Sequence, residues 1–149
     1  MSNVTVMNKQ DTIRFGDNEV RLEIICNSLR LFANGDQAAS GSAEEAEALA
    51  RFFESELPEM MRQIAMILTN AIRTPGRNDH EVTAALDIMR EDHERLNQLV
   101  SVVIDGLQSA ARSPDQAGHT ALRQAISAYL AALRSHMEWS RKIVLKKQP

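Results

Sequence analysis

The sequence contains little of what several specialised classes of protein require. A single cysteine, Cys26, occurs among the 149 residues, so no disulfide can form within the chain and the composition fits a reducing compartment. No stretch approaches the roughly 18 uninterrupted apolar residues of a membrane span, and residues 1–19 lack the apolar run of a signal peptide. We therefore expect a cytoplasmic protein without a membrane-spanning segment.

Charge of one sign, aromatic residues and enzyme motifs are also scarce. The 17 basic and 20 acidic residues leave a net charge of −3, which does not favour phosphate backbones, so we expect no nucleic-acid partner. Aromatic residues make up 4% of the chain and strand-like alternation is rare. The sequence contains no phosphate loop, zinc-pair spacing or nucleophile elbow, and we predict that the protein is not an enzyme.

Helical periodicity is abundant, with apolar residues recurring at intervals of three and four. We expect a loose segment over residues 1–16 and a single domain over residues 17–149. The first predicted helix begins after Gly16 and Asp17 and ends at Asn34. Ser42 with Glu45 forms a capping-box pattern at the start of the second helix. The second helix extends to about Arg73, the third begins near Asn78 and Asp79, and the fourth precedes a basic tail at residues 146–149.

Each predicted helix carries a stripe: the first consists of Glu19, Leu22, Cys26, Leu29 and Ala33, the other three are longer, and two of these contain a histidine. Pro58 interrupts the second stripe, where we predict a bend and not a break. His93 lies in the third stripe and His136 in the fourth. The three longer stripes are Ala46, Leu49, Phe53, Leu57, Met60, Ile64, Ile67 and Ala71, then Val82, Leu86, Met89, His93, Leu96, Val100, Val103 and Leu107, then Leu122, Ile126, Tyr129, Leu133, His136, Ser140 and Ile143.

Four amphipathic helices with short connections predict an all-α fold, an antiparallel up-down-up-down four-helix bundle. In such a bundle His93 and His136 lie at similar depths, about ten to fourteen residues from one pole, at 1.5 Å per residue. The sequence therefore predicts that the two histidines are neighbours.

Three segments carry a resemblance to a known family. They are residues 91–96 (EDHERL), residues 136–140 (HMEWS) followed by 143–145 (IVL), and residues 52–58 (FFESELP). In their order and spacing they resemble the hemerythrin-like, or HHE cation-binding, domain family over roughly residues 17–145. The resemblance implies a hemerythrin-like bundle. It also implies a non-heme di-iron centre, built in that family from histidines on all four helices and carboxylates on the second and fourth.

Most of the implied ligand positions are substituted in this chain. Glu19 stands at the first-helix histidine position, and Ser140 stands at the fourth-helix acid position. His93 and His136 match outright. The second-helix pair is either Met60 with Ile64 or Met61 with Ala65, and Met89 precedes His93 by four residues. Because these side chains bring no bridging carboxylate, we expect that two irons do not fit.

Two functions remain open. The first is a hemerythrin-like bundle with a degenerate metal site that holds no cofactor and acts as a regulatory or protein-interaction module, whose partner is another protein. The second is an oxygen- or redox-responsive sensor that holds one iron or zinc ion on His93, His136 and Glu19. In the first reading the histidines are core residues satisfied by hydrogen bonds to each other, to Ser140 or Glu19, or to a trapped water. Cys26 reads as a small buried hydrophobe or as a redox-reactive thiol.

Overall fold

The computed structural model describes residues 9–34, 42–74, 76–112 and 116–145, and the regular structure in these ranges is entirely helical. Four helical segments pack together, which confirms the prediction of an all-α protein. They are α1 (Lys9–Asn34), then α2 (Ser42–Arg51) continued by η2 (Phe52–Glu56) and α3 (Leu57–Ile72), then α4 (Asp79–Arg112), then α5 (Gln116–Leu145).

Helix α1 begins earlier than the sequence predicted. The expected start after Gly16 is wrong, because residues 9–16 are already helical. Phe15 supplies the reason: its side chain is buried in the core, so extending the helix across Gly16 gains apolar burial. Glycine costs a helix roughly 1 kcal/mol relative to alanine, and burying a phenylalanine contributes about 1.5–3 kcal/mol. The rest of the segment expected to be loose, residues 1–8, lies outside the described residues.

The second segment stays helical through Pro58, as predicted, but its geometry changes just before the proline. Over η2 the turn is π-helical, and the Leu57 N–H donates to the carbonyl of Phe52, five residues back. Pro58 has no N–H to donate and its ring crowds the carbonyl four residues earlier, so a wider turn accommodates it. The disturbance is therefore a π-helical turn inside a continuous helix.

The start of α4 and the buried stripes of the second segment and of α5 follow the sequence closely. The Asn78 side-chain oxygen accepts a hydrogen bond from the Glu81 N–H at 2.8 Å, which caps α4 where predicted. Every residue of the stripe predicted for the second segment is buried, and so are the α5 stripe residues from Leu122 to Ser140. The α4 stripe is buried only in part, with full burial at Leu96, Val103 and Leu107.

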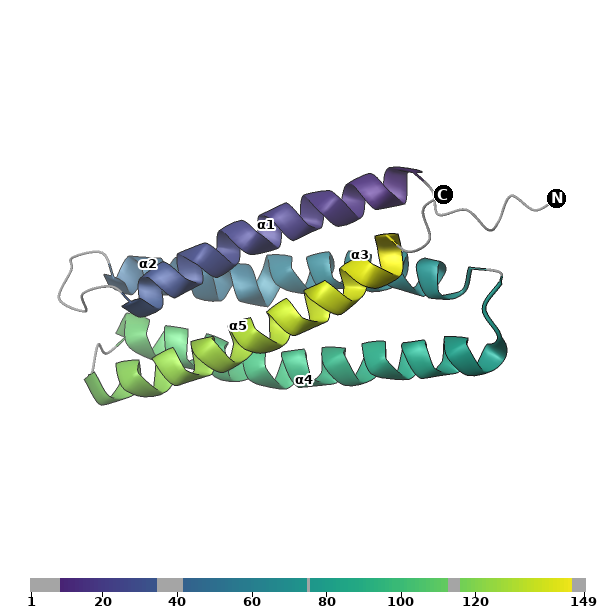
Figure 1. The fold of residues 1–149 in the computed structure, drawn as a ribbon. Coiled ribbons are helices and arrows are strands. Elements are labelled where there is room, and N and C mark those ends of the chain that lie inside the picture. The colour runs from purple at the N-terminus through teal and green to yellow at the C-terminus, as the bar shows by residue number, and fades with distance from the viewer. Residues whose placement is uncertain (1–8, 35–41, 75, 113–115, 146–149) are drawn as a thin grey trace.

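The most extensive helix contact is between α4 and α5, while α1 packs on α5 and α3. Gly106 permits the close approach of α4 to α5, because a Cβ atom there would lie 2.7 Å from Cδ1 of Leu122. In Figure 1 the beginning of α1, the end of α5 and the α3–α4 connection lie on one side of the molecule. Within the described ranges, no helix combines the length and the apolar character needed to cross a bilayer.

Candidate functional site: a buried histidine pair

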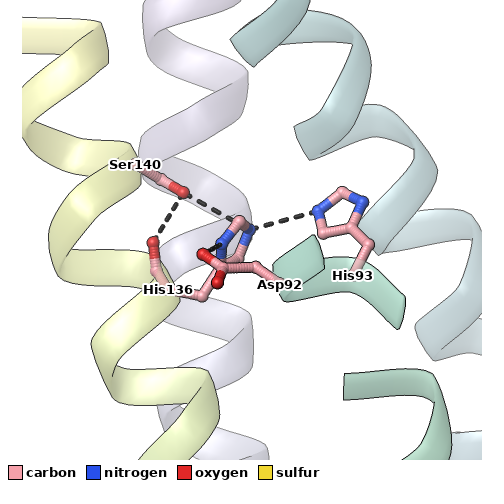
Figure 2. A network of polar contacts seen from close by, with 4 residues as sticks. All are labelled: Asp92, His93, His136 and Ser140. Carbon is pink, nitrogen blue, oxygen red and sulfur yellow. Dashed lines mark hydrogen bonds and ion pairs between the residues drawn. The ribbon is translucent and has the colours of Figure 1, made fainter. Parts of the chain in front are cut away.

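The two stripe histidines meet between α4 and α5. Nε2 of His93 lies 3.1 Å from Nε2 of His136, and the two rings cross edge to face with centroids 4.8 Å apart (Figure 2). The His136 side chain is fully buried, whereas His93 is half-buried. The structure thus places side by side the two residues that the stripes predicted to be neighbours.

Asp92 orients His136 from the opposite side of the ring. Its Oδ2 lies 2.9 Å from Nδ1 of His136, and a carboxylate can only accept, so Nδ1 carries the proton. In a neutral ring, Nε2 of His136 then carries no proton, and its lone pair needs a hydrogen-bond donor. Ser140 does not fill it, because its hydroxyl hydrogen goes to the His136 carbonyl at 2.7 Å, while its Oγ stays 3.4 Å from Nε2.

His93 donates the hydrogen bond that this lone pair accepts. With Nε2–H of His93 donating to His136, the three side chains form one hydrogen-bonded chain in the order His93, His136, Asp92. Nδ1 of His93 then holds a lone pair that no member of this hydrogen-bonded series satisfies. Figure 2 shows that nitrogen on the side of the ring away from His136. The indole of Trp139 stacks on His136 at 5.9 Å and covers its face.

Burial determines the charge of His93. The pKa of His93 is lowered from 6.5 to about 4: loss of solvent has the largest effect, the neighbouring His136 also lowers the pKa, and the Asp92 carboxylate opposes both. His93 is therefore neutral at physiological pH, as the proton arrangement above requires.

Glu19, the third residue of the predicted metal set, is engaged elsewhere. Its Oε2 accepts from Nε of Arg141 at 2.9 Å and lies 2.8 Å from Nη2 of the same guanidinium. It lines a groove between α1 and α5 that also contains Cys26. The structure therefore brings together His93 and His136 but joins Glu19 to α5 by an ion pair.

The second-helix positions of the resemblance contribute no ligand in either register. Met60 and Ile64 are fully buried in the apolar core. Met61 and Ala65, half-buried, offer at most a soft thioether. Among the described residues, no group of three or more His, Cys, Asp or Glu side chains is arranged to hold a metal ion. The donor set does not fit a di-iron centre, which needs bridging carboxylates.

Cys26 lines the same groove between α1 and α5. It is half-buried on α1, and burial raises the pKa of its thiol to about 11 against the opposing effect of Arg30 and Arg134. At neutral pH the thiol stays protonated, so it is a poor nucleophile.

Sequence reasoning missed Asp92 as the partner of His136. The residue stands in the segment that carries the resemblance, directly before His93. Neighbouring positions on a helix point about 100° apart. Because His93 lies on the buried stripe of α4, Asp92 is turned toward one of the two helices that flank α4. The close α4–α5 packing makes that helix α5, which is a property of the assembled fold and not of the local pattern.

No protein-family model, no curated protein and no solved structure matches this chain.

Proposed function

We propose that the protein is a hemerythrin-like, antiparallel up-down-up-down four-helix bundle with a degenerate metal site, and that it acts without catalysis as a regulatory or protein-interaction module. The placement of His93 and His136 in facing stripes supports the hemerythrin-like reading. The internal hydrogen-bonded chain through Asp92 supports the loss of the metal site, because the polar groups satisfy one another.

A row of exposed aliphatic side chains on α1 carries the interaction function. Ile13, Val20, Ile24 and Leu31 are 56%, 59%, 58% and 73% exposed. Their steps of seven, four and seven residues put all four within about 20° of one line on the helix, over a length of about 27 Å. A long apolar row on the outer face of a helix marks an interaction surface more often than a scatter of single residues does.

The shape of the row indicates the kind of partner. A straight row of this length is complementary to the apolar face of an amphipathic helix, which anchors at the same spacing. Val20 and the exposed Met66 of α3 line one groove between α1 and α3, whose other lining residues are mostly polar or charged, as is usual beside the apolar face of a partner helix. We therefore propose an amphipathic helix of another protein as the occupant.

A photo-crosslinking residue at Ile24, irradiated in cells that express the protein, tests this surface. We expect one discrete adduct, lost when Leu31→Glu is added, and no such adduct from the same residue placed at the exposed Glu91 of α4. Equal adducts at both positions, or none at Ile24, contradict the proposal. An adduct of twice the mass of the chain shows self-association in place of a partner helix.

One observation favours the second candidate, a sensor with a single iron or zinc ion. Two Nε2 atoms 3.1 Å apart can both lie at the usual metal distance of about 2.1 Å from one ion. Asp92 on the far nitrogen of His136 is the partner that commonly orients a metal-bound imidazole. Titration with Zn²⁺ or Fe²⁺, followed by histidine ¹⁵N resonances, separates the two: the sensor requires one equivalent to shift both Nε2 signals.

A further inference from the structure

A cleft beside His93 is not used by the proposed function. Its volume is about 270 Å³, and it lies where α3, α4 and α5 meet. Half a dozen apolar side chains line it: Phe53, Leu57, Pro58, Met61, Leu96 and Val100. This volume is just below the usual range for ligand sites, about 300–1,000 Å³, so the cleft suits a small molecule.

The charged group at the cleft is already neutralised. Arg62 is the one ionised side chain among those that line it, and its Nη2 donates to both carboxylate oxygens of Glu59 at 2.7 and 2.6 Å. The neutral ring of His93 adds no charge. An uncharged ligand therefore matches the cleft better than an anion does.

Nδ1 of His93 is a partly buried polar atom of the lining that lacks a partner within the described structure, because the hydrogen bonds from His93 through His136 to Asp92 leave it as an acceptor. Tyr129 also lines the cleft, but its hydroxyl lies within electrostatic reach of the Cys26 thiol, which belongs to the groove between α1 and α5. Polar groups shielded from solvent are rarely left unpaired, so the free Nδ1 is a reason to expect a bound molecule here.

The aromatic part of the lining points to an aromatic ligand. Phe53 and Tyr129 meet edge to face with centroids 5.9 Å apart, and Met61 supplies a thioether beside them. Phe53 belongs to η2, and Leu57 and Pro58 follow it, so the π-helical turn shapes this wall. Single π-helical turns are frequent at functional sites.

We propose that the cleft binds a small uncharged aromatic alcohol, of the class of phenol, whose hydroxyl donates a hydrogen bond to Nδ1 of His93. The ligand would be an effector of the regulatory module. This inference rests on the metal-free arrangement of the proposed function, because a metal ion on Nε2 would leave the proton of His93 on Nδ1.

Titration of the full chain with phenol, toluene and benzoate tests the proposal without any variant. We expect phenol to bind with a Kd of about 1 mM or below, and toluene, which lacks the donor, to bind about tenfold more weakly. The ¹⁵N resonance of His93 Nδ1 should shift with phenol only. Equal affinity for toluene overturns the role of His93, tighter binding of benzoate assigns the cleft to anions, and no binding of phenol overturns the proposal.

A matched pair of variants locates the contact. His93→Gln keeps a donor for His136 at the Nε2 position but removes the Nδ1 acceptor, so phenol affinity should fall about tenfold while toluene affinity stays the same. His80→Gln, at an exposed position of α4, should change neither. If phenol fails to bind to protein free of metal, this inference fails and the proposed function stands. Stoichiometric metal in the purified protein overturns the proposed function instead.

Discussion

The buried stripe of α3 and the contact between α4 and α5 differ in chemistry, although both face the same core. On α3, the buried stripe is wholly apolar, with Met60 and Ile64 at the positions where the resemblance implies ligands. Between α4 and α5, His93, His136 and Asp92 form a hydrogen-bonded chain. A metal centre of the hemerythrin type would spread its ligands over all four helices, whereas here the two histidines and their aspartate partner lie on two. The difference favours a cluster whose polar groups satisfy one another by hydrogen bonds, without a metal ion.

The largest effect should come from restoring the missing ligands. We expect the quadruple variant Glu19→His, Met60→His, Ile64→Glu and Ser140→Glu to recover partial iron binding, and its metal-free form to be several kcal/mol less stable than wild type, because new polar groups would be buried without partners. Iron content and urea unfolding with and without iron measure both effects. If the variant folds but takes up no iron, the Met60–Ile64 register is wrong and Met61 with Ala65 is the next pair to convert.

A single substitution tests the apolar stripe of α3. Ile64→Glu places one carboxyl group at a fully buried position and should cost about 3–4 kcal/mol. Met66→Glu, on the same helix but 57% exposed, should change stability by no more than about 0.5 kcal/mol. Equal losses from the two variants, measured by urea denaturation, would contradict the burial pattern of α3.

A double-mutant cycle tests the hydrogen bond between His93 and His136. His93→Leu alone leaves the Nε2 lone pair of His136 buried and unpaired, at a cost of about 1–3 kcal/mol. The double variant with His136→Leu should lie within about 1.5 kcal/mol of wild type, because both partners are gone and Asp92, 35% exposed, can reach water. Additive losses in the cycle would mean that the histidines do not depend on each other.

The pKa of His93 predicts a pH dependence. Because its pKa is about 4 in the folded chain and 6.5 as a free side chain, the unfolded chain takes up the proton first as pH falls. Stability should decrease from about pH 6.5 to about pH 4 and then level off for this residue, by about 1–2 kcal/mol after solvent screening of a partly exposed ring. The difference between wild type and His93→Gln, which has no such titration, isolates the effect. A difference curve without slope contradicts it.

The smallest effect tests Glu19. Glu19→Gln removes the charge paired with Arg141, and we expect a loss below about 1 kcal/mol because the ion pair is partly exposed. The resonances of His93 and His136 should not move. If both histidine signals shift in the variant, Glu19 belongs to their site after all.

The sequence predicts the helices better than it predicts the partners of the polar groups. Periodicity identifies the buried face of the second segment because each stripe residue needs only an apolar neighbour, of whatever identity. It misplaces the start of α1, since the burial of Phe15 outweighs the local signal of Gly16. The pairing of Asp92 with His136, and of Glu19 with Arg141, depends on which helices lie side by side and at what height. A hydrogen bond requires one specific atom within about 3 Å, and a stripe does not specify that.

Metal analysis of wild-type protein, purified without chelator and combined with an absorption scan for iron-oxo bands, decides whether the histidine pair holds a metal ion. We expect well below one metal ion per chain and no iron-oxo band, because Nε2 of His93 is hydrogen-bonded to Nε2 of His136 and the buried stripe of α3 offers no ligand. About one ion per chain would favour the sensor. Two irons per chain with an oxo-bridge band would contradict the account outright, since the described side chains supply no two coordination spheres.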